Sequence, residues 1–304
     1  MISKHSHYFS HHLLFIPGIL LLLLARGSIA FAHPTASLSN ANLHFSTQER
    51  IGFHSGDDWE PSITADRYGH LYVLYKHYDV SGGQICKGCD LHLLFQRSSD
   101  GGRTWTAPRP IAPVDVKGGQ YDPQIAVDPV DGRTIWASFL QNSNSLIAVV
   151  KSTDFGQTWS PLRIVTNLPP GLDKDELAVR GTTIVVAYDD NYNTWASISL
   201  DGGMHWGTRQ VFRADAHFSL QLSSDAAIDS HGNIFISWDS FDKAHRQNGD
   251  GPATVWVSKS SDDGKDWTRT IIDVSGAPPP CNSCGFAYLS AQMALRIGSD
   301  DTIY

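Results

Sequence analysis

The stretch Ser98–Trp105 reads SSDGGRTW, and the chain repeats its pattern three more times. The copies are STDFGQTW at Ser152–Trp159, SLDGGMHW at Ser199–Trp206 and SSDDGKDW at Ser260–Trp267. The shared frame is Ser-x-Asp-x-Gly-x-x-Trp, and successive tryptophans are 54, 47 and 61 residues apart. Four octapeptides at a nearly regular period indicate a repeated supersecondary unit.

Each octapeptide has the composition of a hairpin turn. The Asp in the third place can accept hydrogen bonds from backbone N–H groups of its own turn, and the Gly in the fifth can take a positive φ. The final Trp carries a large apolar surface into a core. The frame residues are therefore predicted to be structural. They are Ser98, Asp100, Gly102, Trp105, Ser152, Asp154, Gly156, Trp159, Ser199, Asp201, Gly203, Trp206, Ser260, Asp262, Gly264 and Trp267.

Strand patterns surround every octapeptide, so that the chain can be stacked on itself from Asp57 onward. A second strand rich in β-branched and aromatic residues reads HLYVLYK, RTIWASFL, TTIVVAYD and NIFISWD in the four units. A third strand leads into the octapeptide and a fourth leaves it. We predict four complete four-stranded units and no helix. The first strand of each unit is expected at Pro61–Asp66, Pro123–Asp128, Asp175–Gly181 and Asp225–Ser230.

The repeated frame resembles the Asp-box, or bacterial neuraminidase (BNR) repeat, of the sialidase superfamily of β-propellers. The resemblance spans the four octapeptides and the strands around them, from Asp57 to the end of the chain. It implies an all-β propeller of four-stranded antiparallel blades, with each box on an outer hairpin at the face away from the active site. Because the superfamily also contains other glycosidases and propellers without known catalysis, the resemblance implies architecture more than activity.

A fifth unit begins at Tyr288 with YLSAQMALRIGSDDTIY, and Thr302-Ile303-Tyr304 stands where the other units enter their second strand. An incomplete sheet exposes an edge, which propellers avoid. The resemblance implies six blades. We therefore expect four complete blades plus the start of a fifth, in a truncated copy of a six-bladed propeller.

Residues 1–32 have the composition of a signal peptide. Lys4 precedes the apolar run Leu13–Leu24, and Ala30-Phe31-Ala32 fits a cleavage site. The apolar run, about 12 residues, is short for a membrane span, and a retained N-terminal anchor is the alternative. We expect a secreted, extracellular chain in which 33–56 is a leader with a possible closing strand at Leu43–Phe53, and 57–304 is the propeller domain.

The charge balance is acidic. The formal net charge is −8, and removal of Lys4 and Arg26 with the signal peptide leaves 21 basic against 31 acidic residues, or −10. Such a chain has no basic face for nucleic acid and no polybasic patch for a membrane surface. With 41% hydrophobic residues it can bury a sizeable core. The expected partner is an extracellular glycan or a cell-surface component.

The four cysteines form two close pairs, Cys86-x-x-Cys89 and Cys281-x-x-Cys284. The signal peptide places them in an oxidising compartment, where disulfides are favoured. Two local disulfides are the preferred interpretation. A four-thiolate metal site and a pairing between the two loops are the alternatives.

The resemblance also implies the parts of a sialidase site: three arginines for a sugar carboxylate, an Asp acid/base and a Tyr–Glu pair. The first arginine belongs to an Arg-Ile-Pro motif, but here Trp59-Glu60 precede Pro61. The loop after the first unit's second strand contains Lys76 and no arginine, and its Asp79 is the candidate acid/base. Glu176, at the start of the third unit's first strand, is the second catalytic candidate.

Acidic residues gather where the first strands begin. Bunched carboxylates repel anions, suit Ca²⁺ or neutral sugars, and can contain a glycosidase pair in which one pKa is raised by its neighbour. The alternative is that they cap strand ends and solvate loops. Aromatic side chains nearby, including Trp195, can stack on sugars or pack in the core. The candidates for the ligand-binding mouth are Asp58, Trp59, Glu60, Tyr121, Asp122 and Asp175, with Asp57, Asp173 and Asp225 beside them.

These observations predict a secreted, sialidase-like glycoside hydrolase that acts on extracellular glycans. Exo-α-sialidase activity is one form of this prediction. The absence of the Arg-Ile-Pro motif argues against that form. A non-catalytic propeller that binds a glycan, a protein or a cell-wall component is the alternative, as is an inactive fragment. No cofactor is required by this chemistry, and Ca²⁺ is an optional ligand.

Overall fold

The computed structural model divides the chain into two units, Met1–Glu49 and Arg50–Tyr304. It describes residues 47–52, 56–78, 93–113, 118–143, 145–166, 168–190, 192–213, 218–242, 253–274, 276 and 293–304, with the backbone alone at 218–222, 224 and 242. The predicted signal peptide, most of the leader, Asp79 and the cysteines Cys86, Cys89, Cys281 and Cys284 lie outside these ranges. The fold of the second unit follows.

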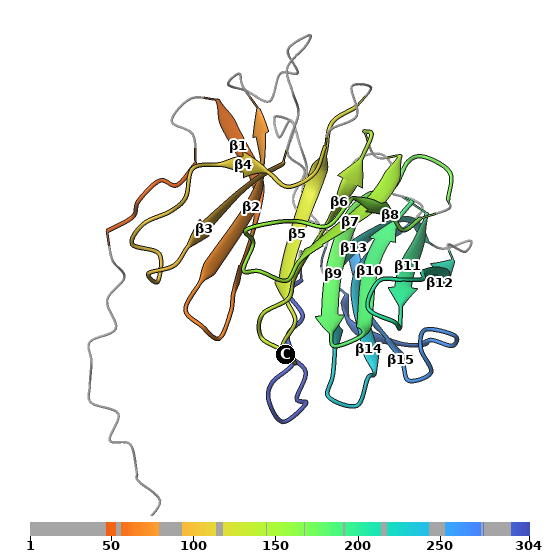
Figure 1. Ribbon diagram of the computed structural model, residues 1–304. Helices are drawn as coiled ribbons and strands as arrows, with labels where there is room; N and C mark the ends of the chain where they lie inside the picture. The colour runs from red at the N-terminus through yellow and green to blue at the C-terminus, as the bar shows by residue number, and fades with distance from the viewer. Residues whose placement is uncertain are drawn as a thin grey trace, which may run out of the picture. The chain divides into compact units, whose positions relative to one another are not determined.

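Sixteen strands form four antiparallel sheets of four strands, and each sheet keeps the order of the sequence (Figure 1). The described residues contain no helix, as predicted. It follows that none of them belongs to a helix long and apolar enough to cross a membrane. The strands are β1 (Asp57–Ala65), β2 (Leu71–Tyr78), β3 (Leu93–Ser98) and β4 (Arg109–Pro110); β5 (Tyr121–Val127), β6 (Ile135–Gln141), β7 (Leu146–Ser152) and β8 (Arg163–Ile164); β9 (Asp173–Arg180), β10 (Thr183–Asp189), β11 (Asn193–Ser199) and β12 (Gly207–Arg213); and β13 (Phe218–Ile228), β14 (Ile234–Asp242), β15 (Ala253–Ser260) and β16 (Thr268–Val274).

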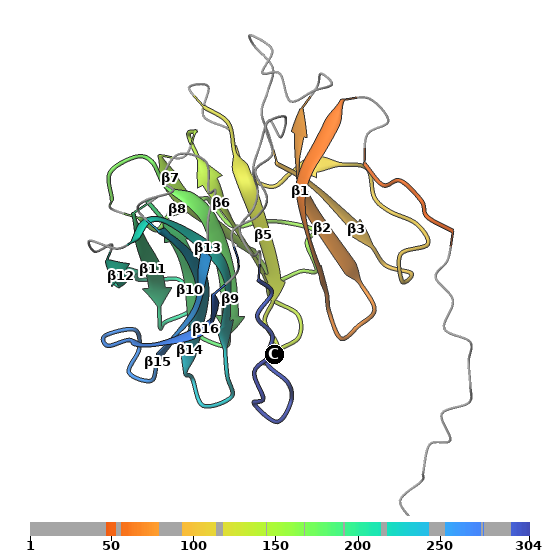
Figure 2. The same cartoon turned by 180° about the vertical axis from the view of Figure 1, so that it is seen from behind.

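The sheets pack face to face in chain order, as the blades of a propeller do. Their first strands contact one another in succession, β1 with β5, β5 with β9 and β9 with β13, and Figure 2 shows this arrangement from behind. Apolar side chains fill the space between neighbouring sheets, for example Phe95 with Phe139 and Ile198 with Trp238. Because both faces of the second and third sheets are covered, their second strands β6 and β10 are almost continuously apolar rather than alternating.

The first strands begin earlier than the sequence pattern predicts. β1 starts at Asp57 rather than Pro61, β5 at Tyr121, β9 at Asp173 and β13 at Phe218. Each strand crosses a β-bulge and then pairs again with its neighbour, as Asp57 does with Tyr78. A bulge interrupts the alternation of side chains, so the period-two pattern ends before the strand does. The acidic residues expected to precede the strands therefore lie within them.

The four octapeptides fold alike at the hairpins between third and fourth strands. In each, the Ser hydroxyl donates to the Asp carboxylate at 2.7–2.9 Å and accepts the N–H of the Gly at 2.8–2.9 Å. The Asp carboxylate also accepts the N–H of the residue before the Trp at 2.9–3.0 Å. The Gly carbonyl accepts the indole N–H of Trp105, Trp206 and Trp267 at 3.1–3.2 Å. Ser98 pairs with Leu71, so the octapeptides lie at the opposite end of the sheet from Tyr78.

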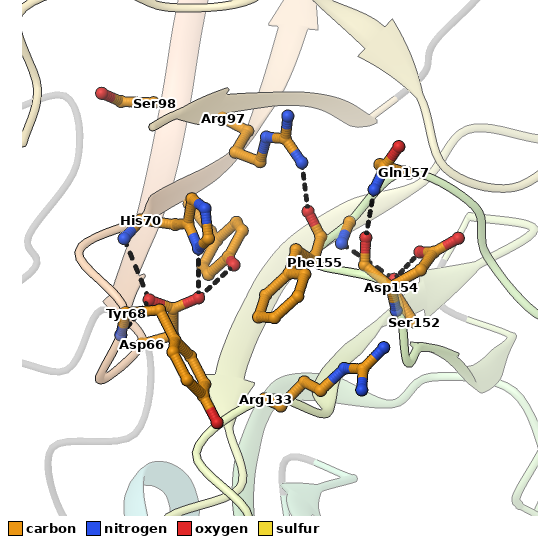
Figure 3. A network of polar contacts seen from close by, with 12 residues as sticks. Asp66, Tyr68, His70, Arg97, Ser98, Arg133, Ser152, Asp154, Phe155 and Gln157 are labelled. Atoms are coloured by element: carbon orange, nitrogen blue, oxygen red, sulfur yellow. Dashed lines mark hydrogen bonds and ion pairs between the residues drawn. The ribbon is translucent and has the colours of Figure 1, made fainter. Parts of the chain in front are cut away.

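Cationic side chains of one sheet hold the octapeptide of the next. Arg97 Nη1 donates to the carbonyl oxygen of Phe155 at 3.0 Å, and Arg109 Nη2 donates to Gly156 and to Gln157. Figure 3 shows this contact, with the Phe155 ring beside Tyr68, His70 and Arg133. In this octapeptide Arg109 donates to the Gly156 carbonyl, and the indole N–H of Trp159 has no hydrogen-bond partner in the described part of the chain.

The second and third sheets repeat this arrangement. Lys151 Nζ donates to the carbonyl oxygen of Gly202 at 3.2 Å, and Arg163 Nη1 donates to that of Met204. We call such a hydrogen bond, from a cation of one sheet to an octapeptide carbonyl of the next, a clasp. Clasps tie sheets together at the octapeptide end, where no strand hydrogen bonds run between them.

Residues 293–304 lie against the fourth sheet. Leu295 and Ile297 pack on Ala227, Phe235 and Val257. The N–H of Leu295 donates to Asp225 Oδ2 at 2.7 Å, and Ile297 bridges to Ile303. This segment occupies the position expected for the start of a fifth unit.

Candidate functional site

Three neighbouring first strands place a non-glycine residue in the left-handed conformation at the same step of the repeat. Glu60 has a φ of 50°, Asp122 of 48° and Lys174 of 48°. Each sits at the bulge of its strand, two residues before Ser62, Gln124 and Glu176 respectively. Such a backbone costs on the order of 1–3 kcal/mol per residue and persists only when the surroundings impose it. Its effect here is to bring the three side chains together, and we call them the bulge triad.

The bulge triad is closely connected. Lys174 Nζ lies 3.3 Å from Glu60 Oε1 and 3.6 Å from Asp122 Oδ2. The backbone N–H of Lys174 also donates to Asp122 Oδ2 at 3.4 Å. The carboxyl groups of Glu60 and Asp173 are each hydrogen-bonded to Asp122. Asp122 is thus the centre of the cluster.

The pKa values of the three carboxyl groups differ. Burial acts to raise the pKa of Asp122, but hydrogen bonds from Glu60 and Asp173 and the charge of Lys174 hold it below its usual range. Burial, followed by the hydrogen bond and the charge of Asp122, raises the pKa of Glu60 to about 7. Burial and the charge of Asp122 raise the pKa of Asp173 to about 6. Asp122 therefore ionises first of the three, and Glu60 keeps its proton to the highest pH.

Two further acids follow Lys174 on β9. Asp175 is fully buried, accepts a hydrogen bond from Ser138 at 2.5 Å, and its Oδ1 has no partner in the part of the chain that the structure describes. Burial raises the pKa of Asp175 well above its usual value. Burial, and then the charges of Asp225 and Asp175, raise the pKa of Glu176 in the same way. Glu176 keeps a small exposed area, and Asp122 acts on it through its charge without a hydrogen bond.

The aromatic candidates have different surroundings. Trp59 is 46% exposed and meets Tyr78 edge to face at 5.6 Å, so it offers a ring surface to solvent. The rings of Tyr121 and Tyr78 flank the buried Lys76 Nζ at 4.8 and 5.1 Å. Trp195 packs in the core and donates its indole N–H to Asp190 at 2.8 Å. Of these rings, Trp59 is the one placed to stack on a sugar.

Asp58 forms its ion pairs with residues outside the bulge triad. Its Oδ1 lies 2.7 Å from His77 Nδ1 and its Oδ2 lies 3.9 Å from Arg50. These contacts hold the start of β1 against β2. Among the described residues, no group of three or more His, Cys, Asp or Glu side chains is placed to hold a metal ion.

Lys174 and Asp173 are site residues whose roles the sequence analysis did not recognise. A signal for Lys174 was available, because stacking Glu60-Pro61-Ser62 and Asp122-Pro123-Gln124 on Lys174-Asp175-Glu176 aligns Lys174 with the two acids. Because Lys174 is a cation and the aligned residues Glu60 and Asp122 are acids, the alignment was not recognised from the sequence. Only the spatial order of the strands shows that the three positions share one site.

The geometry decides which carboxyl groups can work as an opposed pair. A glycosidase separates its two carboxyl groups by about 5–5.5 Å or about 6.5–9.5 Å, depending on stereochemical outcome. Glu60 and Asp122 are hydrogen-bonded, so they are too close to act from opposite sides of a sugar. Asp122 and Glu176 lie on the adjacent strands β5 and β9, and their pKa values move in opposite directions. Such divergence is typical of a catalytic base or nucleophile and its acid.

The arrangement of the sheets defines the class of fold, a β-propeller of the type found in sialidase-like glycosidases. Comparison with solved structures supports this class. The chain matches a protein of unknown function from Dyadobacter fermentans with 20% identity over 74% of this chain and 71% of that one, at a TM-score of 0.53. It matches the α-L-arabinanase of Penicillium chrysogenum with 14% identity over 70% of this chain and 66% of that one, also at 0.53.

A Hadza microbial sialidase, Hz136, aligns with 20% identity over 71% of this chain at a TM-score of 0.49. The aligned part spans 47% of that sialidase, or about half of its length. No protein-family model matches the chain, and no curated protein does. At these identities the structural matches establish the fold.

Proposed function

We propose that this protein is a glycoside hydrolase whose reaction takes place at the bulge triad. The observation that carries the proposal is that adjacent first strands hold Asp122, whose pKa is below its usual range, and Glu176, whose pKa burial raises well above its usual value. Asp122 supplies the carboxylate that faces the anomeric carbon or activates a water, and Glu176 supplies the proton for the departing glycosidic oxygen. The arabinanase match provides a propeller hydrolase as precedent for the fold.

Glu60 and Lys174 act as positioning residues in this scheme. Their contacts hold Asp122 in the ionised form and fix the direction of its carboxylate. Trp59, exposed beside the triad, provides a surface for the sugar ring. We place the substrate outside the cell, as the predicted signal peptide requires. Asp79, the acid/base expected from the resemblance, stays a prediction.

The charge of the site favours a neutral sugar over a sialic acid. Among the described residues, the cation of the bulge triad is a lysine, and it is already paired with Glu60 and Asp122. A sugar carboxylate in a partly dry site needs bidentate arginine donors and is repelled by acids. Trp59-Glu60 stand where an Arg-Ile pair would supply the first of these arginines. Exo-α-sialidase activity is therefore the less favoured form of the proposal.

A panel of fluorogenic aryl glycosides, comprising arabinofuranosides, mannosides, glucosides, galactosides and a sialoside, tests the activity. On the substrate that is cleaved, Asp122→Asn and Glu176→Gln are expected to lower kcat/KM by about 10²–10⁴-fold. Azide restores turnover in a variant that has lost its catalytic carboxylate, which distinguishes a chemical role from a folding defect. Asp128→Asn, an acid of the same sheet as Asp122 but at the opposite end of its strand, is the control.

The alternative function is a propeller that binds glycans without cleaving them. The same purified protein distinguishes this alternative from the hydrolase. Binding on a glycan array without hydrolysis of any bound glycan would exclude the hydrolase and leave the binding protein. Full activity in both the Asp122→Asn and the Glu176→Gln variants would place the chemistry elsewhere.

A further inference from the structure

Within the described residues, no clasp joins the third and fourth sheets as it joins the earlier pairs. The clasping cations Arg97 and Lys151 directly precede the Ser of their octapeptides, and the equivalent residue of the third sheet is Ile198. The clasping cations Arg109 and Arg163 pair with Phe95 and Val149, and Arg209 is the residue at that register of the third sheet. Its Nη1 donates to the carbonyl oxygen of Thr208 in its own strand. Ile198 packs on Gly264, where an added Cβ would lie 2.2 Å from its Cδ1. An apolar contact has therefore replaced the first cation, and the second is directed to its own strand.

A cavity of about 480 Å³ opens at this unclasped junction, between β12 and the octapeptide of the fourth sheet. Its lining includes three cations, one acid, an amide and an indole, contributed by Arg213, Lys265, Arg269, Asp266, Gln210 and Trp267. The local formal charge is therefore three minus one, or +2, on a chain whose formal charge is −8. Volumes of about 300–1,000 Å³ are typical of small-molecule sites.

All three cations of the cavity are exposed to solvent. Arg213 is exposed, and the Lys265 side chain is 66% exposed with its Nζ 3.8 Å from Asp263. The Arg269 guanidinium lies 5.2 Å from the centre of the Phe212 ring, which fixes its plane beside the cavity. Arginine donors in a planar fork match carboxylate and sulfate oxygens. Trp267 is half-buried and forms an apolar wall next to them.

We propose that this cavity, which we call the junction pocket, binds a sugar ring that carries a carboxylate or a sulfate group. Arg213, Lys265 and Arg269 pair with the anionic group, Gln210 hydrogen-bonds a hydroxyl, and Trp267 contacts the ring. The junction pocket lies along the fourth strand β12, as far as Arg213 at the end that pairs with Asn193, and on the fourth octapeptide, whereas the bulge triad lies on the first strands β1, β5 and β9. It is therefore a second site, independent of the proposed hydrolase reaction, that selects anionic glycans.

The test follows the indole N–H signal of Trp267 in a ¹H–¹⁵N spectrum of the whole chain, assigned with Trp267→Phe. Glucuronate and glucose 6-sulfate are the anionic probes, glucose is the neutral probe and inorganic sulfate is the bare anion. Both anionic sugars are expected to shift the Trp267 signal to saturation, and glucose is not. Equal affinity for inorganic sulfate would reduce the pocket to an adventitious anion site, and equal affinity for glucose would remove the role of the cations. Either result overturns the proposal.

Matched variants locate the binding. The double variant Arg213→Gln/Lys265→Gln is expected to weaken binding of the anionic sugars by about tenfold or more, since two charge-assisted hydrogen bonds are lost. Arg103→Gln removes an exposed cation at the position of Lys265 in the first octapeptide and changes the net charge in the same direction. It should leave the affinity unchanged, as should Asp122→Asn. Equal weakening by Arg103→Gln would show that the net charge, not the junction pocket, attracts the ligand.

Discussion

Lys174 Nζ lies 3.3 Å from Glu60 Oε1, although 114 residues separate the two along the chain. The contact exists because both residues occupy the bulge of a first strand and both take a left-handed backbone. Asp122 occupies the same position in the strand between them. A repeated backbone feature thus brings different side chains from three repeats into one site.

Replacing Lys174 with Met is expected to raise the pKa of Asp122, because a charge that favours the carboxylate is removed. The acid limb of the pH profile of kcat/KM should move to higher pH. Lys174→Arg keeps the charge and should hold the limb near its original position. An unchanged profile in Lys174→Met would show that the lysine does not control Asp122.

Glu60 should make the folded state less stable as the pH rises. Its pKa of about 7 in the folded chain exceeds the ordinary value of 4.5, so the folded state binds the proton more tightly than the unfolded state does. The stability contribution is present below about pH 4.5 and is lost as the pH rises through about 7. Glu60→Gln should flatten this part of the curve in urea denaturation at several pH values. A parallel curve for the variant would contradict the raised pKa.

Gly264→Ala should be one of the most destabilising glycine substitutions in the chain. The residue has a φ of +78°, and a Cβ there would lie 2.2 Å from Ile198 Cδ1. Strain and overpacking together should cost about 2–4 kcal/mol. Gly202→Ala is the matched control, since its φ is +73° with no atom within 4 Å of the added Cβ. It should cost about 1–2 kcal/mol from backbone strain alone. Equal losses of unfolding free energy would show that Ile198 yields without cost.

Arg109→Gln should lower the stability of the chain by about 0.5–1.5 kcal/mol, because it removes the clasp to Gly156 and Gln157. Arg209→Gln is the matched control, since Arg209 stands at the same register of the third sheet but donates to Thr208 of its own strand. Thermal unfolding of both variants measures the effect. Equal losses of stability would show that the clasp between sheets contributes nothing beyond a local contact.

The repeated octapeptides were sufficient to predict the four sheets, since turn chemistry and strand alternation are local properties. The hydrogen bonds of Ser98, Asp100 and Gly102 recur in every copy for the same reason. Strand starts were predicted too late, because the bulges interrupt the alternation. The sequence did not predict the role of every single side chain. Trp195, a candidate for stacking on a sugar, donates its indole N–H to Asp190 and packs against the core.

The sequence alone determined the all-β architecture, the number of complete sheets and the places where acids collect, because each depends on neighbours within one repeat. Tertiary structure decided which acids meet, which of them have raised or lowered pKa values, and which sheets a clasp joins. Those properties depend on burial and on distances between repeats, as between Asp122 and Glu176. The sequence of one repeat does not contain the distances between residues of different repeats. These distances are determined by the packing of neighbouring sheets.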